Sequence, residues 1–244
     1  MEGISMEDYE RFSQRRREAI LSRVAEACAS AGRDVAEVDV VAVSKTVDVP
    51  EVVASWRAGW RHFAENRPQE LVRKLAGLAE LDGVEPISFD MIGNLQKNKI
   101  NQVVGRVRKI HSISGEALAQ DVAKRSLTHA VISRVLLEVN VSGEQSKSGM
   151  TPDEVREAFG RIMELEGIEV EGLMTMAPAH DADAARRTFC GLRELRDELE
   201  RHHGVSLPTL SCGMSDDFPI AIEEGSTLVR LGRVAFDPAY PFGN

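Results

Sequence analysis

The chain has 244 residues, of which 43% are hydrophobic and 28% charged, and its formal net charge is −9. This composition suffices for one large core, and the acidic balance argues against nucleic-acid or anionic-membrane binding, which require a basic surface. The N-terminus lacks the apolar segment of a signal peptide and no later run approaches membrane-spanning length, so we expect a cytoplasmic protein that enters no membrane.

The expected elements alternate between helix and strand. A first helix is predicted over residues 6–31, where Gly32 provides a stop. Apolar, β-branched runs then predict eight strands, at residues 38–43, 62–65, 86–92, 109–113, 135–141, 168–176, 207–210 and 228–235. Helical patterns separate them, at residues 50–58, 68–78, 96–104, 116–127, 151–165 and 218–223, with a further amphipathic helix that ends at Gly204.

Strands that alternate with helices form right-handed βαβ units and a parallel sheet. The strands are apolar with little alternation, as expected when both faces of the sheet are buried. We therefore predict an α/β fold, a single (β/α)8 TIM barrel over about residues 38–236 with an extra N-terminal helix. An open doubly wound sheet is the alternative, but no glycine-rich dinucleotide turn follows the first strand.

The C-terminal ends of the strands are where such barrels bind ligands, so the residues there are the first candidates. Lys45 ends the first strand and shares a face with Val43 and Val41, which we expect to point into the barrel. A lysine held against apolar walls is a good nucleophile and can form a Schiff base with an aldehyde. From this short segment alone, a strand-end lysine that reaches solvent is the better interpretation.

The seventh and eighth strands carry candidate anion ligands. Ser215 stands at the expected start of a short helix, where free backbone N–H groups suit a phosphate. Alternatively, Ser215 only caps that helix, and Asp216 and Asp217 would oppose a phosphate unless they point outward. Arg230 lies in mid-strand among apolar residues, where an unpartnered charge is costly, which favours a functional role. Gly232 lets the backbone approach an anion closely.

Six segments together resemble one family. In chain order they are VAVSKTV, AENRPQE, FDMIGNLQKNK, EVNVSGEQSKSGM, GLMTM and LSCGMSDDFPIAIEEGSTLVRLG. This series is similar to that of the YggS-type pyridoxal 5′-phosphate (PLP) homeostasis proteins, single-domain relatives of the N-terminal barrel of alanine racemase. The resemblance runs from about Val38 to Phe236, which is most of the chain.

The resemblance implies that the cofactor is PLP, held as an internal aldimine on Lys45. It implies that Ser215 and the backbone around Gly232 hold the phosphate, and that Arg230 faces the pyridine nitrogen. Asn66 would lie beside the cofactor and Met214 in the same wall. The predicted cofactor-binding residues are therefore Lys45, Val43, Asn66, Met214, Ser215, Arg230 and Gly232.

Three places depart from the family pattern. Ala64, Arg67 and Pro68 stand where the family usually has glycine, tyrosine and valine, Asp90 stands for a usual histidine, and Asp237 for a common glycine. The residues expected to bind PLP are unchanged, so the departures concern contacts at the rim of the pocket and any role of that tyrosine or histidine.

A role as a carrier of PLP, without robust catalytic activity, is the favoured interpretation. Arginine is always charged and disfavours protonation of the pyridine nitrogen, which makes PLP a weaker electron sink. Related racemases also use a tyrosine from a second domain, whereas the tyrosines here, Tyr9 and Tyr240, lie outside the predicted strands. The alternatives are an amino-acid racemase, or a lyase in which Lys45 forms a Schiff base with a phosphorylated substrate.

Several further expectations concern partners and surface. The expected partners are PLP and PLP-requiring apoenzymes, with no nucleic acid, and a monomer is expected. Cys28, Cys190 and Cys212 have no metal-ligand spacing, and each is expected to be a buried small residue. A run of three arginines, residues 15–17, is expected on a solvated helix face. Lys147 is a candidate for a contact at the pocket rim, and a mobile loop is the alternative.

Overall fold

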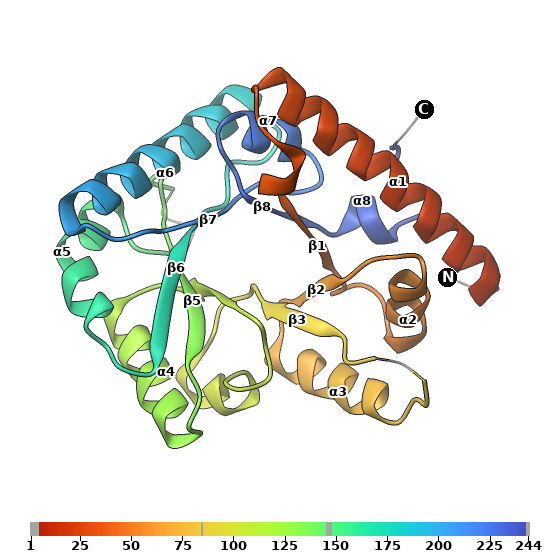
Figure 1. Ribbon diagram of the computed structural model, residues 1–244, viewed down its shortest axis with the longest axis horizontal. Coiled ribbons are helices and arrows are strands. Elements are labelled where there is room, and N and C mark those ends of the chain that lie inside the picture. Colours follow the sequence, from red (N-terminus) through yellow and green to blue (C-terminus); the bar gives the residue numbers. More distant parts are fainter. Residues whose placement is uncertain (1–4, 84, 145–147, 243–244) are drawn as a thin grey trace.

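The protein is a closed barrel of eight parallel strands surrounded by helices, as the sequence predicts (Figure 1). The computed structural model describes residues 5–83, 85–144 and 148–242. The strands are β1 (Asp39–Val43), β2 (His62–Glu65), β3 (Ser88–Met91), β4 (Ile110–Ile113), β5 (Ser133–Glu138), β6 (Ile168–Met174), β7 (Thr209–Ser211) and β8 (Leu228–Leu231). β1 pairs with both β2 and β8, which closes the ring.

The helices lie between the strands in sequence and outside them in space (Figure 1). Two begin at a full capping box, at Asp48 and at Thr151. The helices are α1 (Met6–Ser30), α2 (Val49–Arg57), α3 (Pro68–Ala79), α4 (Glu116–Thr128), α5 (Pro152–Met163), α6 (Ala182–His203), α7 (Phe218–Glu223) and α8 (Arg233–Phe236). Short 3-10 helices cover Val35–Glu37 and Lys97–Gln102.

Several predicted boundaries need correction. The strands expected over residues 135–141 and 168–176 end at Glu138 and Met174. The strand expected over residues 228–235 ends at Leu231, because the chain turns at Gly232 (φ −101°, ψ −83°) and α8 begins at once. The helix expected over residues 96–104 is a 3-10 helix, Lys97–Gln102, that begins without a side-chain cap.

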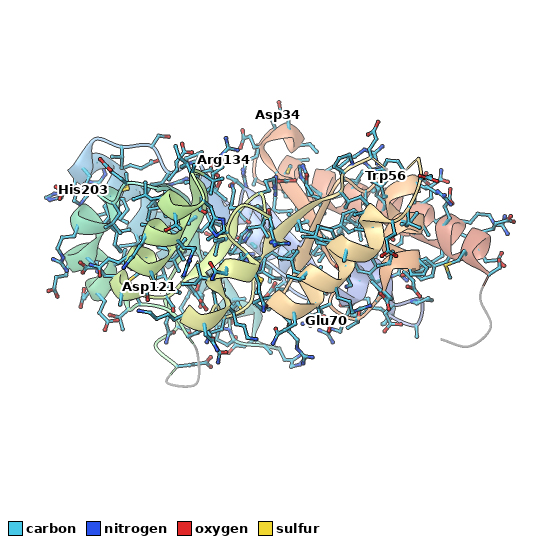
Figure 2. All side chains as sticks on the ribbon, turned by 90° about the horizontal axis from the view of Figure 1, so that it is seen from below. Asp34, Trp56, Glu70, Asp121, Arg134 and His203 are labelled. Carbon is cyan, nitrogen blue, oxygen red and sulfur yellow. The ribbon has the colours of Figure 1, made fainter. Side chains whose placement is uncertain are left out.

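Two apolar layers build the core. The larger lies between strands and helices, while a small cluster of Val41, Val43, Ala64 and Leu228 fills part of the barrel interior, with Ile92 packed against it. This confirms that Val41 and Val43 point inward. Asp34, which precedes β1, and Glu70, which follows β2, lie toward opposite ends of the barrel (Figure 2).

The N-terminal helix α1 packs against α2, α7 and α8. The Tyr9 hydroxyl donates to the carbonyl of Phe236 at 3.2 Å, and Arg16 donates to the carbonyls of Val234 and Tyr240 at 3.2 Å. Arg16 is only 8% exposed, so the prediction of a solvated arginine run is wrong at this position. The buried guanidinium ties α1 to the segment that follows β8.

Candidate functional site

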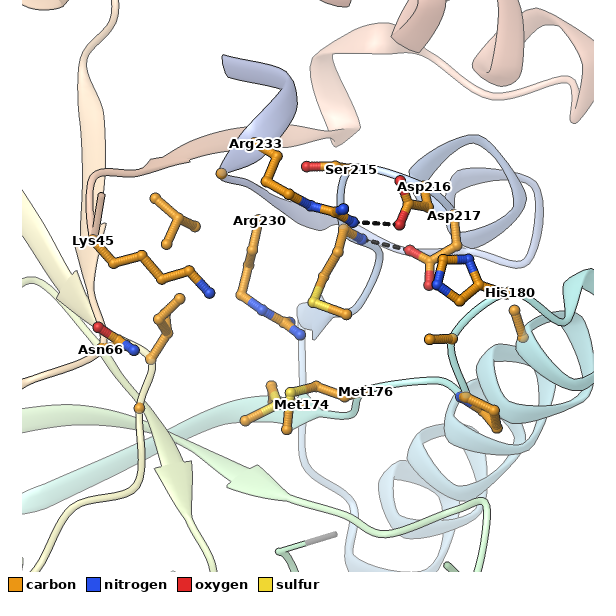
Figure 3. A pocket seen from close by; sticks show the side chains of 18 of the residues that line it. Lys45, Asn66, Met174, Met176, His180, Ser215, Asp216, Asp217, Arg230 and Arg233 are labelled. Atoms are coloured by element: carbon orange, nitrogen blue, oxygen red, sulfur yellow. Dashed lines mark hydrogen bonds and ion pairs between the residues drawn. The ribbon is translucent and has the colours of Figure 1, made fainter. Parts of the chain in front are cut away.

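A cavity of about 880 Å³ opens at the C-terminal ends of the strands. Its lining comes from the ends of β1, β5, β6 and β8 and from the loops after β2, β3, β6 and β7 (Figure 3). The structure brings all seven predicted residues into this lining, namely Val43, Lys45, Asn66, Met214, Ser215, Arg230 and Gly232. The volume is typical of a small-molecule site.

Lys45 lies two residues beyond β1 and projects into the cavity toward Arg230 (Figure 3). Val43 and Ile92 supply apolar surface beside it. Lys45 is exposed, which agrees with the interpretation favoured from its short segment, a strand-end lysine that reaches solvent, and not with a lysine desolvated by apolar walls. The cavity is open to solvent at this position, and the lysine amine is accessible to a ligand.

A buried ion pair holds the backbone next to Lys45. Lys74 of α3 and Glu65 of β2 are 1% and 0% exposed and form an ion pair. Lys74 Nζ also donates to the Ser44 carbonyl at 2.6 Å, and the Ser44 hydroxyl donates to Glu65 at 2.7 Å. These bonds position the end of β1 and the end of β2, from which Lys45 and Asn66 respectively enter the site.

Asn66 is half-buried and packs closely against the loop after β3. A Cβ atom at Gly93 would lie 2.0 Å from the Asn66 carbonyl oxygen, so only glycine permits this approach. Gly93 belongs to the FDMIGNLQKNK segment, and this contact gives that segment a structural reason for its glycine.

Arg230 is 4% exposed and its guanidinium forms part of the cavity lining. It donates to the carbonyl and the hydroxyl of Ser211, at 2.7 and 2.6 Å, and to the Thr175 carbonyl at 3.0 Å. Burial lowers the pKa of Arg230, while its ordinary value is high enough for the side chain to stay charged at neutral pH. A buried, partnered cation in mid-strand is what the sequence predicts.

Ser215 and Gly232 lie in the loops after β7 and β8, and both line the cavity. The Ser215 hydroxyl accepts a hydrogen bond from the Val234 amide at 3.2 Å, so it supports the start of α8. It does not cap α7, whose N-cap is Asp217. A Cβ atom at Gly232 would touch only Val43, at 3.6 Å, so open space lies beside Gly232 on the cavity side.

The two acidic residues after Ser215 are both engaged. Asp216 pairs with Arg233 at 2.5 Å and accepts from the Tyr240 hydroxyl at 2.5 Å, which lowers its pKa. Asp217 accepts from the Met214 amide at 2.6 Å, and burial raises its pKa. Because the carboxylate of Asp216 is paired with the guanidinium of Arg233, it repels a bound anion less than the sequence alone suggests.

Several residues of the cavity lining were not predicted from the sequence. Glu138 and Met174 are the last residues of β5 and β6, so attention to every strand end could have found them. Burial raises the pKa of Glu138, which accepts from the Ser148 hydroxyl at 2.5 Å. Met176 and His180 lie in the loop before α6 (Figure 3). Met176 ends the GLMTM segment, whereas no sequence pattern marks His180.

Other expectations have mixed outcomes. Cys28 and Cys212 are buried as predicted, but Cys190 is half-buried. Lys147 lies outside the described residues. Within the described part of the chain, no cluster of three or more His, Cys, Asp or Glu side chains is placed to hold a metal ion. None of the helices in the described ranges is long and apolar enough to cross a membrane.

The fold and the cavity define a class of protein: a (β/α)8 barrel with an accessible lysine and a buried arginine at its ligand-binding end. A family model described as alanine racemase, N-terminal domain, matches residues 17–237. The pyridoxal phosphate homeostasis protein of Aquifex aeolicus is 42% identical over 89% of this chain and 94% of its own length. That of Pseudomonas aeruginosa is 37% identical over 89% and 91%. The chain belongs to this family of pyridoxal phosphate homeostasis proteins.

Solved structures agree with this assignment. PipY of Synechococcus elongatus PCC7942, with PLP bound, has a TM-score of 0.77 and 30% sequence identity, covering 87% of this chain and 99% of its own. Alanine racemase of Clostridium difficile 630 has a TM-score of 0.71 at 16% identity, covering 97% of this chain and 59% of its own. At that identity the second similarity supports the fold alone.

Proposed function

We propose that this protein binds pyridoxal 5′-phosphate in the cavity and serves PLP homeostasis, with Lys45 as the point of covalent attachment. One observation carries the proposal: Lys45 and Arg230 come from the paired strands β1 and β8 and enter the same cavity. The names of the relatives and the PLP-bound PipY structure support the choice of ligand.

The residues of the cavity fit the chemistry of PLP. The amine of Lys45 is accessible to an aldehyde, and the two condense with loss of water. Ser215 and the backbone around Gly232 hold the phosphate in this proposal, at the loops after strands seven and eight. Asn66, Met214 and Val43 flank the ring, and the open space beside Gly232 supports a close approach by the anion.

Arg230 would face the pyridine nitrogen and keep it unprotonated, because the guanidinium cannot accept a proton. Bound PLP supplies an electron sink, and that sink is weaker when the pyridine nitrogen stays neutral. This favours a protein that holds a reactive aldehyde over one that catalyses robust turnover. Delivery of PLP to apoenzymes and a monomeric state are part of the same proposal.

The two tyrosines also support a carrier. The hydroxyl of Tyr9 is bound to the Phe236 carbonyl, and that of Tyr240 to Asp216, with the Ser215 carbonyl at 3.3 Å. Neither belongs to the lining of the cavity formed by the described residues. An acid or base positioned as in a tyrosine-dependent racemase is therefore not supplied by these two side chains.

The proposal is tested by the visible absorption spectrum of purified protein after addition of PLP and removal of the excess. Wild type and the control Lys124→Ala, which changes an exposed lysine, should show the band of covalently bound PLP, and Lys45→Ala should lack it. No band in any of the three would contradict PLP binding and favour the lyase alternative. A band that persists in Lys45→Ala would contradict the assignment of Lys45. Robust racemisation of an amino acid, lost in Lys45→Ala, would contradict the carrier role.

A further inference from the structure

A chain of buried hydrogen bonds runs from Arg230 into the interior of the barrel. The Ser211 oxygen lies 2.6 Å from Arg230 Nη1 and 3.0 Å from His111 Nδ1, and His111 Nε2 lies 3.1 Å from Asp90 Oδ2. Ser211, His111 and Asp90 are each 0% exposed. β3, β4, β7 and β8 thus each contribute one side chain to a continuous path that ends in the cavity.

The charges at the two ends determine the direction of every bond in this chain. Burial alone would raise the pKa of Asp90, but hydrogen bonds from His111 and Arg108 lower it to about 2, so Asp90 is a carboxylate. Burial lowers the pKa of His111, with the positive charges of Arg230 and Lys109 acting in the same direction and Asp90 opposing them. His111 is therefore neutral at pH 7, and its ring carries one proton.

That proton must lie on Nε2, because the Asp90 carboxylate can only accept. Nδ1 is then an acceptor, so the Ser211 hydroxyl donates to it, and the Ser211 oxygen accepts from Arg230. Every donor in the chain therefore points away from Arg230 and toward Asp90. Hydrogen bonds aligned in this manner polarise one another, which strengthens the chain and orients the guanidinium.

Arg108 holds the far end of the chain in place. It donates to Asp90 through Nε and Nη2, at 3.0 and 2.8 Å, and to Asp39 through Nη1 at 2.8 Å. Asp39 in turn lies 2.7 Å from His62 Nδ1. Asp90 is therefore fixed by a two-pronged ion pair.

Arg230 depends on this chain because its own hydrogen bonds all go to neutral oxygen atoms, those of Ser211 and Thr175. The carboxylates of Asp217 and Glu138 attract it only at longer range. These three hydrogen bonds engage Nη1 and Nη2, so further N–H groups of this five-donor side chain remain for a ligand in the cavity.

We propose that Asp90, His111 and Ser211 are positioning residues that orient Arg230 toward the ring of the bound cofactor. This inference rests on the proposed function, since it assumes a pyridine ring beside Arg230. It goes further in assigning a role to residues that lie outside the cavity lining and never touch the ligand. It also gives Asp90, a departure from the family pattern, a specific task in this chain.

The test is a double-mutant cycle on the dissociation constant of pyridoxine 5′-phosphate, which has the ring and the phosphate but no aldehyde. Calorimetry on this probe reports binding without the covalent bond to Lys45. Ser211→Ala and Asp90→Asn should each weaken binding by about tenfold. The double variant should bind as the single variants do, because Ser211→Ala already interrupts the chain and Asp90→Asn already removes the charge that fixes its direction. Ser133→Ala, which removes a buried strand hydroxyl that bonds only Ser126, is the matched control and should bind as wild type does.

Each result separates the two proposals. If wild type binds neither PLP nor the probe, the proposed function is wrong and the positioning role is wrong with it. If wild type binds PLP and the probe, and Ser211→Ala binds the probe as tightly as wild type does, the positioning role alone is overturned. The same holds if the losses of affinity in Ser211→Ala and Asp90→Asn simply add in the double variant. Should Asp90→Asn fail to fold because Arg108 loses a partner, His111→Gln takes its place in the cycle under the same expectation.

Discussion

At the scale of single residues, Gly232 shows how the site is shaped by an absent side chain. Its φ of −101° is accessible to other residues, and a Cβ there would make only an ordinary contact with Val43. The packing around Gly232 therefore does not demand glycine. The space that the missing side chain leaves belongs to the cavity, beside Ser215, where the phosphate is proposed to bind.

Gly232→Ala should weaken PLP binding by about tenfold, equivalent to about 1.4 kcal/mol, because the added methyl group occupies the space proposed for the phosphate. Thermal unfolding without ligand should change little. Titration of PLP followed by absorbance measures the binding affinity, and calorimetry measures the thermal unfolding. Gly115→Ala, at an extended glycine with no atom within 4 Å of the new Cβ, is the control and should bind as wild type does. Unchanged affinity in Gly232→Ala would contradict the phosphate position.

At the scale of elements, the ends of β1 and β2 are held by a side chain of α3. Lys74 reaches from the helix to Glu65 and to the Ser44 carbonyl, in a region that is almost fully buried. The second oxygen of Glu65 is buried without a hydrogen-bond partner. Such a pair is costly to desolvate. Replacing only one of the two residues therefore lowers the stability more than replacing both, because it leaves a buried charge unpaired.

Lys74→Met should lower the free energy of unfolding by about 3 kcal/mol, since it leaves the Glu65 carboxylate buried without its partner. Urea denaturation measures this change. Adding Glu65→Gln should recover about 1 kcal/mol, because the uncompensated charge is then gone. Arg73→Met, at an exposed position of the same helix, should leave the free energy of unfolding nearly unchanged. A single variant as stable as wild type would show that the ion pair does not hold these strands.

At the scale of the whole molecule, the barrel interior is divided into an apolar part and a polar part. Val41, Val43 and Leu228 fill one side, while Asp90 and His111 lie in the other. Asp90 also pairs with Arg108, so that the barrel interior contains a buried charge network. The stability of the barrel must therefore depend on the protonation of Asp90.

The pKa of Asp90 falls from its ordinary value of 3.8 to about 2 on folding. A lowered pKa stabilises the folded state above the unfolded value, and this contribution is lost as the pH falls from about 4 toward 2. The ionised Asp90 should contribute about 2 kcal/mol at neutral pH. In urea denaturation at a series of pH values, the difference in stability between wild type and Asp90→Asn should shrink as the pH drops through this range. A difference that stays constant with pH would contradict the assigned ionisation.

The sequence by itself determined the elements and the strand-end candidates. Alternating apolar runs, the capping box at Thr151 and the positions of Lys45 and Arg230 are encoded by residues close together in the chain, so local patterns predict them. The barrel follows because eight strand–helix units can bury their apolar faces only by closing on one another. Family motifs then predicted the seven residues that line one cavity.

Only the tertiary structure decided which distant residues meet. The pairing of β1 with β8 brings Lys45 and Arg230 together, and His111 reaches Ser211 across 100 positions of sequence. The burial of Arg16 and the early end of β8 at Gly232 were not predicted, since both depend on packing between the two ends of the chain. Burial, hydrogen-bond partners and protonation are properties of a residue's surroundings, and in a closed barrel those surroundings come from every part of the chain.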